Sequence, residues 1–491
     1  MPTNGNSEIL NTETVRICSK GPFQIGRHVT IDTLPDNLLL ELFAFYRLTT
    51  MESWDYSWKW HTLVHVCRRW RVIVFASLHR LDLRLYCTYG TPVRGNLDCW
   101  PALPIIVNYW DDVDFKPSSP EDEDNIIAAL EHADRVSRID VLATSSLFGK
   151  LAIVMQEPFP ALTYLRLWSG DTIAPVFPKD TFAGFVPRLQ NLSMTCIPFP
   201  ALPTLLLSAS DLVSLRLWKI PTAGYISPEV MFTCLSVLPK LEWLAIEFNS
   251  PTSRPDWRSR RIPPQTRTVL PALTQFEFRG VSEYLEDLVD RIDAPLLDHV
   301  GITFFHQLIL EIPQVSDFVG RTGSLNSPDE AIVCSFPGAV SITLYQPRTT
   351  GNPSQVRLGV SCEQLDWQVS SLAQICSQCL PLHSRVKQLC MGAGYLQPGW
   401  KDNMDPVEWL EVFRWFTAVE KLYISNALAP HIASAFEDVE GDMVADILPS
   451  LRTLTFSGSR RSASVEHFIS ARQLSGYPIT ACYRNSKDSF F

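Results

Sequence analysis

The sequence predicts an α/β fold in which a short all-helical module precedes a curved repeat solenoid with a parallel sheet. With 491 residues the chain exceeds the ~250 to 300 residues at which single cores stop growing, so several domains or one elongated array are expected. Its composition, 46% hydrophobic and 19% charged, allows a large buried core. A short leucine-rich phrase recurs along most of the chain, and the residues before 78 lack it.

The phrase is a Pro-containing approach followed by Leu-x-x-Leu-x-Leu, with Ile, Val, Phe or Met as equivalents. Its copies begin at Val136, Leu162, Leu189, Leu212, Leu241, Leu273, Leu297, Val419 and Leu451. Between Leu162 and Leu297 the copies are spaced by 23 to 32 residues, within or just beyond the ~20 to 29 residues of leucine-rich repeats. Ordinary buried strands share the alternation but predict no common spacing. The spacing therefore favours a leucine-rich-repeat-like solenoid.

Alternating leucines place two side chains on one face of a short strand, which one strand cannot bury alone. Stacked copies share one core in a parallel sheet, with the connecting helices on the other face. Prolines precede several strands, where we expect them to end the preceding helix: Pro160, Pro187, Pro239, Pro271, Pro295 and Pro449. Between Arg321 and Arg385 the phrase is recognisable only around Val340, Ile342 and Leu344, so an irregular repeat or an insertion is expected there.

Residues that alternate with the buried leucines should point out of the sheet on its concave side. The residues expected to bind a target are Tyr164, Arg166, Trp168, Arg216, Trp218, Trp243 and Glu247. Trp, Tyr and Arg are enriched at the energetically dominant positions of protein interfaces, which makes this face the predicted binding surface. The alternative is that a loop or the C-terminal tail covers the face within the chain.

The segment 31–77 has a helical pattern instead. Pro35 suits the first turn of a helix, and the following apolar positions have the spacing of one helix face: Leu38, Leu39, Leu42, Phe43 and Tyr46. A second helix is expected around Leu63 to Cys67 and a third around Trp70 to Val74. A module of fewer than fifty residues exposes apolar surface that its own core cannot cover, so it needs a partner.

Three stretches of this segment resemble the F-box: Leu34-Pro35-Asp36-Asn37-Leu38-Leu39, Leu42-Phe43, and Leu63-Val64-His65-Val66-Cys67-Arg68-Arg69-Trp70-Arg71. Followed by Phe75-Ala76-Ser77 and a repeat region, they look like the large fungal families of F-box proteins with leucine-rich repeats. The resemblance implies binding to a Skp-type adaptor, and through it to a cullin, while the repeats select the protein to be ubiquitinated. The adaptor contacts that it implies are Leu34, Pro35, Leu38, Leu42, Val66 and Trp70. Asn37 stands where the family usually has Glu, and Trp54 to Lys59 lengthen the gap between helices.

The expected organisation is a disordered segment (1–30), the F-box (31–77), a linker with the first solenoid elements (78–130), the solenoid (131–480, irregular near 321–385) and a tail (481–491). The net charge of -10 argues against nucleic acid as a partner. Thinly spread cysteines suit buried free thiols of the cytoplasm or nucleus. Because neither a signal peptide nor an 18-residue apolar run is evident, no membrane association is expected.

No catalytic motif is evident, and no cofactor or metal is expected. His61 and His65 have the spacing of zinc-protease ligands, but Thr62 replaces the required Glu. Cys376-x-x-Cys379, with His383 and Cys390, has too loose a spacing for a structural zinc site. The expected function is the substrate-recognition subunit of a Skp-cullin-F-box ubiquitin ligase. The alternatives are a leucine-rich-repeat interaction scaffold not coupled to ubiquitination, and a metal-dependent enzyme around Cys376 and Cys379.

Overall fold

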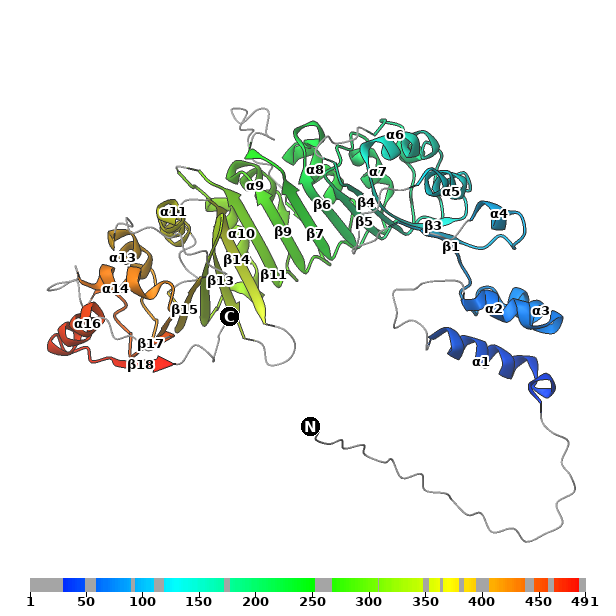
Figure 1. Cartoon of the computed structure of the whole chain (residues 1–491). Helices are drawn as coiled ribbons and strands as arrows, with labels where there is room; N and C mark the ends of the chain where they lie inside the picture. Colours follow the sequence, from blue (N-terminus) through cyan, green and yellow to red (C-terminus); the bar gives the residue numbers. More distant parts are fainter. Residues whose placement is uncertain are drawn as a thin grey trace, which may run out of the picture. The chain divides into compact units, whose positions relative to one another are not determined.

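The structure is a computed structural model of the chain, and Figure 1 shows its helices and strands. It describes residues 30–48, 59–89, 93–109, 119–171, 177–251, 267–307, 309–347, 353–362, 365–378, 384–393, 406–437, 446–457 and 463–484. Two compact units divide between Leu83 and Arg84, and we call them the helical unit and the repeat unit. Almost all of the predicted N-terminal segment lies outside the described residues.

The helical unit contains η1 (Ile31–Thr33), α1 (Asp36–Leu48), α2 (Lys59–Val66) and α3 (Arg68–Ala76). Leu39 and Phe43 of α1 are buried, and the Phe43 ring lies 4.7 Å from the ring of Trp70 in α3. Leu38 and Leu42, which we expected on the same apolar face, are each 47% exposed. The helix therefore has two apolar stripes, of which one packs against α2 and α3 and the other faces solvent.

The Cys-Arg-Arg-Trp-Arg stretch connects the three helices. The Cys67 sulfur accepts a hydrogen bond from the backbone N–H of Trp70 (3.5 Å) and so caps α3. The Arg69 guanidinium donates to the carboxylate of Asp36 (2.5 Å) and to the C=O of Leu34 (2.6 Å). Arg71 donates to the C=O of Val64 in α2 (2.9 Å). These bonds fix the start of α1 against α3.

The repeat unit is built on one 16-stranded sheet, counted over its described residues. In sheet order the strands are β1 (Leu85–Cys87), β2 (Ile105–Tyr109), β3 (Val136–Ala143), β4 (Tyr164–Ser169), β5 (Asn191–Thr195), β6 (Ser214–Ile220), β7 (Trp243–Phe248), β9 (Gln275–Gly280), β11 (His299–Phe305), β14 (Ser354–Ser361), β13 (Ala339–Gln346), β12 (Glu330–Phe336), β15 (Gln388–Ala393), β16 (Lys421–Ile424), β17 (Thr453–Ser457) and β18 (Thr480–Arg484). The last strand occupies residues 480–484, so the predicted tail from 481 is shorter than expected.

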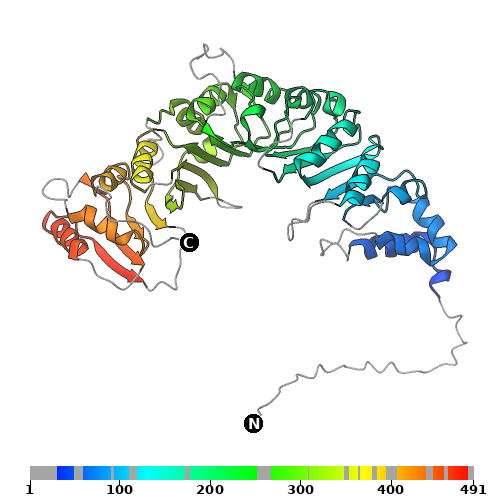
Figure 2. The same cartoon turned by 45° about the horizontal axis from the view of Figure 1, so that its top comes forward.

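Helices cover one face of this sheet. In Figure 2 they follow the outer side of the repeat unit and the strands its inner side. The helices are α4 (Arg94–Leu97), α5 (Pro120–Leu130), α6 (Ser145–Val154), η2 (Thr181–Gly184), α7 (Leu202–Ser208), η3 (Thr222–Gly224), α8 (Pro228–Leu235), α9 (Ser282–Val289), α10 (Pro313–Arg321), η5 (Gly323–Leu325), α11 (Leu365–Gln378), α13 (Pro406–Arg414), α14 (Ala429–Glu437) and α16 (Ala463–Leu474). The mixed α/β architecture with a large parallel sheet is that of a leucine-rich-repeat-like solenoid.

All three apolar positions of the nine predicted copies are buried, with at most 5% of any of these side chains exposed. A tenth copy that the sequence search missed, Val386, Leu389 and Met391, is buried in the same way at β15. The prolines do not end helices as expected. Instead, Pro160 follows Phe159 in a turn closed by the N–H of Leu162 bonding to the C=O of Phe159 (3.2 Å). Pro suits the second position of such a turn because its φ is already fixed near the required value.

The irregular segment is an antiparallel meander inserted in the parallel sheet. Within the described strands of this sheet, only the pairs β12–β13 and β13–β14 are antiparallel. The order of the three strands is reversed, so that β14 pairs with β11 and β12 pairs with β15, both in parallel. This antiparallel interruption of the otherwise parallel sheet lies in the segment between Arg321 and Arg385 where the sequence predicts an irregular repeat or an insertion. The predicted phrase around Val340 lies in β13, the central strand of the meander.

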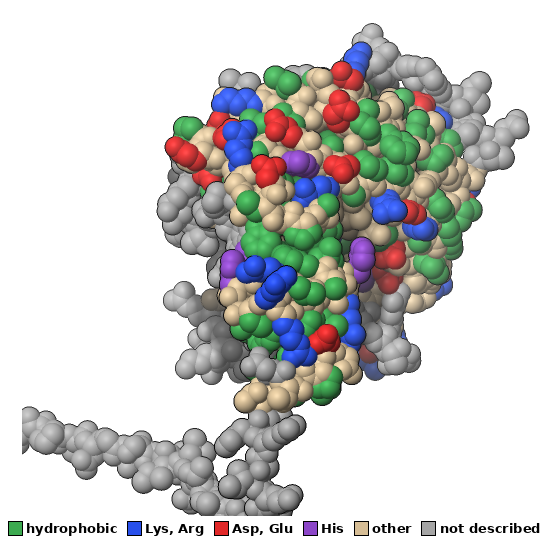
Figure 3. All heavy atoms as spheres, turned by 90° about the vertical axis from the view of Figure 1, so that its right-hand side faces the viewer, with side chains coloured by type: hydrophobic (Ala, Val, Ile, Leu, Met, Phe, Trp, Pro, Cys, Tyr) green, Lys and Arg blue, Asp and Glu red, His purple; other side chains and the backbone are tan. Residues whose placement is uncertain are grey.

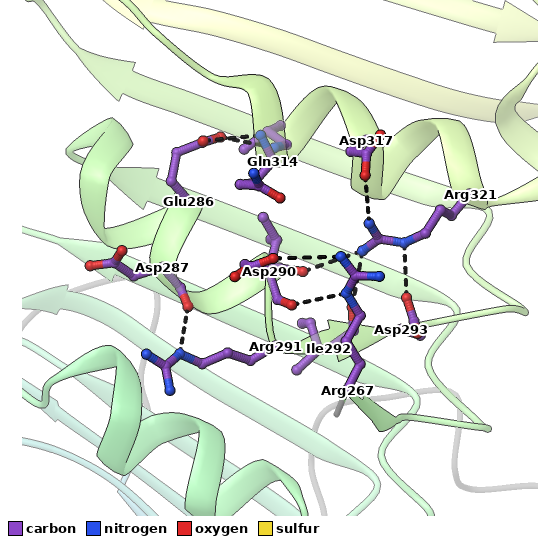
Figure 4. A network of polar contacts seen from close by, with 12 residues as sticks. Arg267, Glu286, Asp287, Asp290, Arg291, Ile292, Asp293, Gln314, Asp317 and Arg321 are labelled. Carbon is purple, nitrogen blue, oxygen red and sulfur yellow. Dashed lines mark hydrogen bonds and ion pairs between the residues drawn. The ribbon is translucent and has the colours of Figure 1, made fainter. Parts of the chain in front are cut away.

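On the helix side, polar contacts tie neighbouring repeats together beside a short pair of parallel strands, β8 (Thr268–Val269) and β10 (Ile292–Asp293). Glu286 of α9 accepts hydrogen bonds from the backbone N–H groups of Gln314 (3.0 Å) and Val315 (2.8 Å), and so caps the first turn of α10 (Figure 4). Arg321, at the end of α10, donates to Asp293 (2.9 Å). These contacts fix successive helices and hence the strands beneath them.

Candidate functional site

The side chains between the buried leucines form rows across the open face of the sheet. In β4, Tyr164, Arg166 and Trp168 are half-buried, whereas Leu165 and Leu167 are fully buried. Because neighbouring strands pair in register, residues of one row lie side by side. The middle row, from β3 to β14, is Asp140, Arg166, Ser193, Arg216, Ala245, Glu277, Gly301 and Arg357. All seven predicted target-facing residues lie half-buried on this open face.

A pocket of about 380 Å³ opens over β5. This strand presents the short side chains of Asn191, Ser193 and Thr195, while the strands on either side present large ones. The pocket is therefore the space above the small side chains of β5, between the bulky side chains of β4 and β6. It brings together six of the predicted residues: Tyr164, Arg166, Trp168, Arg216, Trp218 and Glu247.

Trp243, the seventh predicted residue, does not line this pocket. Its ring is covered by the Arg216 guanidinium, whose carbon lies 3.7 Å from the ring centroid. At this distance the ring attracts the cation and also restricts its side-chain freedom. Trp243 therefore positions Arg216 at the edge of the pocket.

A β-bulge shapes the far wall of the pocket. The register between β6 and β7 shifts after Leu217, so that Trp218 and Lys219 both precede the next pair, Ile220 with Phe248. Lys219 has a φ of 51°, a conformation that non-glycine residues rarely adopt. The backbone N–H of Cys196 bonds to the C=O of Trp218 (3.0 Å). The bulge directs the Lys219 side chain to the pocket rim, a feature that regular alternation did not predict.

Arg166 is engaged by a buried carboxylate. Its Nε and one terminal nitrogen donate to the two oxygens of Asp140 at 2.6 and 2.9 Å. Arg138 donates to the same carboxylate at 2.9 Å and lies over the Tyr164 ring, 3.8 Å from its centroid. The Asp140 side chain is only 2% exposed, so the two arginines supply the charge that its burial requires. This cluster fixes one wall of the pocket.

A second pocket of about 520 Å³ adjoins the first and shares Trp218 and Glu247 with it. Over it Arg279 contacts Glu247 (3.3 Å) and the Ser361 hydroxyl (3.3 Å). Burial raises the pKa of Glu277, although Arg216 and Arg357 act in the opposite direction. We call the two adjoining pockets the strand-face groove. The sequence did not predict the second pocket of this groove. The order of β12 to β14 is reversed in the sheet, so the strand that pairs with β11 cannot be identified from the order of strands in the sequence.

In the helical unit, the predicted adaptor contacts lie at or near the surface. Pro35, Leu38, Leu42 and Val66 are exposed, and Leu34 and Trp70 are half-buried. Phe45, 65% exposed, continues the stripe of Leu38 and Leu42 by one further turn. Figure 3 shows hydrophobic side chains exposed among Lys and Arg side chains on the face of the molecule that it presents. Arg69, which sequence reasoning did not single out, anchors the Leu34 backbone.

The described residues contain no group of three or more His, Cys, Asp or Glu suited to a metal ion. Cys376 is buried in α11, and burial raises the pKa of the Cys390 thiol to about 11. Cys379 and His383 lie outside the described residues. Burial, with the nearby His65, lowers the pKa of His61 to about 4.

The ten cysteines in the described ranges are free. No helix in these ranges is long and apolar enough to cross a membrane.

Neither a protein-family model nor a curated protein matches the chain. Solved structures do match, among them the leucine-rich repeat-containing protein LegL7 from Legionella pneumophila. That match has 11% sequence identity and a TM-score of 0.26, and it covers 67% of this chain and 95% of the other.

Proposed function

We propose that this protein is the substrate-recognition subunit of a Skp-cullin-F-box ubiquitin ligase. In this proposal the helical unit binds a Skp-type adaptor, which is linked to a cullin, and the strand-face groove binds the target protein. The chain needs no catalytic residue of its own for this role. By holding the target beside the conjugating enzyme, it raises the effective concentration of the target's lysines.

The observation that carries the proposal is the exposed apolar stripe of α1. Of the 19 large hydrophobic side chains exposed in the described part of the chain, seven lie in the helical unit: Ile31, Leu38, Leu42, Phe45, Tyr46, Val66 and Val72. Exposed apolar side chains at successive turns of one helix cost solubility unless a partner covers them. The stripe is suited to a partner with a hydrophobic surface and so supports an adaptor-binding role. This agrees with the resemblance of Leu38, Leu42 and their neighbours to the F-box.

The test is recovery of the adaptor and cullin with the full-length protein. Leu38→Ala together with Leu42→Ala should remove at least nine tenths of the adaptor recovered, because both side chains lie in the stripe. The matched control is Leu207→Ala with Leu296→Ala, two leucines of the repeat unit that are 51% and 59% exposed. The control should recover the adaptor fully. Equal recovery with both double variants would show that the stripe does not bind the adaptor.

The second candidate is a leucine-rich-repeat scaffold that binds its partner without causing ubiquitination. Asn37, which stands where the F-box usually has Glu, favours this candidate. Both candidates use the strand-face groove, and they differ only in whether a cullin is recovered. Recovery of the target without cullin, under conditions that preserve cullin complexes, would support the scaffold.

A further inference from the structure

Among the residues that the structure describes, three cations of the strand-face groove have no opposing charge at ion-pair distance. Arg166 is bound to Asp140 and Arg279 contacts Glu247. Arg216, Lys219 and Arg357, by contrast, make no ion pair within 4 Å among the described residues. The buried Nε of Arg216 also has no hydrogen-bond partner there. Buried donors are nearly always satisfied in folded proteins, so this nitrogen can bind an acceptor that the described residues do not supply.

The groove is also electropositive in an acidic protein. Its lining contains five cations, Arg166, Arg216, Lys219, Arg279 and Arg357, and two carboxylates, Glu247 and Glu277. The whole chain has a net charge of -10. A local excess of positive charge attracts an anionic partner.

The spacing of these cations selects among anionic partners. Arg216 and Arg357 occupy the same row and are separated by Ala245, Glu277 and Gly301 on three intervening strands. At ~4.8 Å per strand, four steps place them about 19 Å apart. One phosphate group cannot contact both. An extended chain advances roughly 3.3 Å per residue and so reaches from one to the other in about six residues.

Aromatic and small side chains lie next to the charged side chains of the strand-face groove. The pocket over β5 is walled by Tyr164, Trp168 and Trp218 and floored by Ser193. Its 380 Å³ accommodates a large apolar or aromatic side chain between aromatic faces. Along the middle row, the small residues Ser193, Ala245 and Gly301 alternate with larger ones. An extended backbone can approach the sheet at these small residues.

We propose that the strand-face groove binds an extended acidic segment of a partner protein, which places carboxylates at Arg216 and Arg357 and an apolar side chain in the pocket over β5. The segment runs across the strands, because Arg216 and Arg357 lie in one row on different strands. This inference rests on the proposed function in one respect, namely that targets bind to this face. It adds the chemistry by which a target is chosen.

The probe is a labelled synthetic 16-residue peptide with Glu at every third position and Phe, Gly and Ser between, tested on the full chain by fluorescence anisotropy. A twin peptide with Gln for every Glu should bind at least tenfold more weakly. Raising the NaCl concentration from about 50 to 300 mM should also weaken binding of the acidic peptide, because exposed charge pairs are screened. Equal binding of the neutral twin would overturn the proposal.

The protein variants locate the binding. Arg216→Gln with Arg357→Gln should reduce affinity for the acidic peptide at least tenfold, and Lys219→Gln alone about threefold. Arg188→Gln with Arg452→Gln removes the same charge from two exposed positions in the turns before β5 and β17, and it should change affinity less than twofold. Because Arg216 packs on Trp243, thermal unfolding of each variant is compared. Unchanged binding by the Arg216 and Arg357 variant would overturn the proposal, as would a neutral twin with one phosphoserine binding as tightly as the acidic peptide.

Failure of this inference is distinguishable from failure of the proposed function. If the Arg216 and Arg357 variant still recovers the target while Trp168→Ala with Trp218→Ala loses it, the face binds targets without acidic recognition. If the peptide results hold but the target is still recovered by both variants, the groove binds acidic segments and the target site lies elsewhere. Adaptor recovery is unaffected in both cases.

Discussion

At the scale of single residues, Arg472 of α16 shows what a buried charge requires. Its side chain is fully buried, and it donates to the C=O groups of Ile447 (2.9 Å), Pro449 (3.4 Å) and Tyr477 (3.4 Å). Burial lowers the pKa of its guanidinium. The bonds connect α16 to the turn before β17 and to the turn that follows the helix, so this residue closes the repeat that contains α16.

Replacement of this guanidinium should therefore destabilise the repeat unit. We expect Arg472→Ala to reduce the free energy of unfolding by about 3 kcal/mol, because buried carbonyl groups lose their donors and a cavity remains. Urea unfolding followed by circular dichroism measures the change. Arg452→Ala, the same substitution at an exposed position, should change stability by less than about 0.5 kcal/mol. Similar values for the two variants would contradict a closing role for Arg472.

Which side chains face the groove was predictable from the sequence, but their electrostatic state was not. Alternation with Leu165 and Leu215 places Arg166 and Arg216 on the open face. Only the register between β3 and β4 reveals that Asp140 engages Arg166. Likewise, the bulge at Lys219 depends on a left-handed backbone conformation that the leucine pattern does not encode. Pairing and bulges are properties of two strands, whereas alternation is a property of one.

At the scale of secondary-structure elements, the repeats were predictable where each strand bears its own copy of the phrase. The meander of β12 to β14 was not, because alternation is the same in parallel and antiparallel strands. The hairpin between β12 and β13 was also not predicted. Its turn contains Gly338, with a φ of 84°, but a single glycine does not distinguish this turn from the other glycine positions in the sequence. The first helix was predicted, but the prediction assigned all of its apolar residues to one face, whereas the structure has two apolar stripes.

The shared core of the strands has a measurable consequence. Leu165, Leu215 and Leu244 are fully buried and lie in one row, with Leu192 between the first two. Each replacement by Ala should reduce the free energy of unfolding by about 2 to 5 kcal/mol, the range of large-to-small changes in packed cores. Chemical denaturation of the three single variants tests this, with the exposed Leu207→Ala as control. Near-zero changes at all three positions would contradict the register of the sheet.

At the scale of the whole molecule, the two proposed interaction surfaces lie on two separate units. The apolar stripe is carried by helices before Leu83, and the strand-face groove by strands after Arg84. No residue of the stripe lines the groove. Mutations at sites that share no partners usually act independently. The proposed receptor role needs this independence, because a receptor must bind the target and the adaptor at the same time.

The last prediction is that the two binding activities can be lost separately. Trp168→Ala with Trp218→Ala removes both tryptophans that wall the pocket over β5, and it should abolish target recovery while leaving adaptor recovery unchanged. Truncation of a dominant interface residue typically costs about 2 kcal/mol or more, so two together exceed a hundredfold loss of affinity. Target and adaptor are quantified in the same pull-down, with Trp367→Ala, 47% exposed on α11, as a matched aromatic control. Loss of both partners would indicate general unfolding, and loss of neither would exclude the groove as the target site.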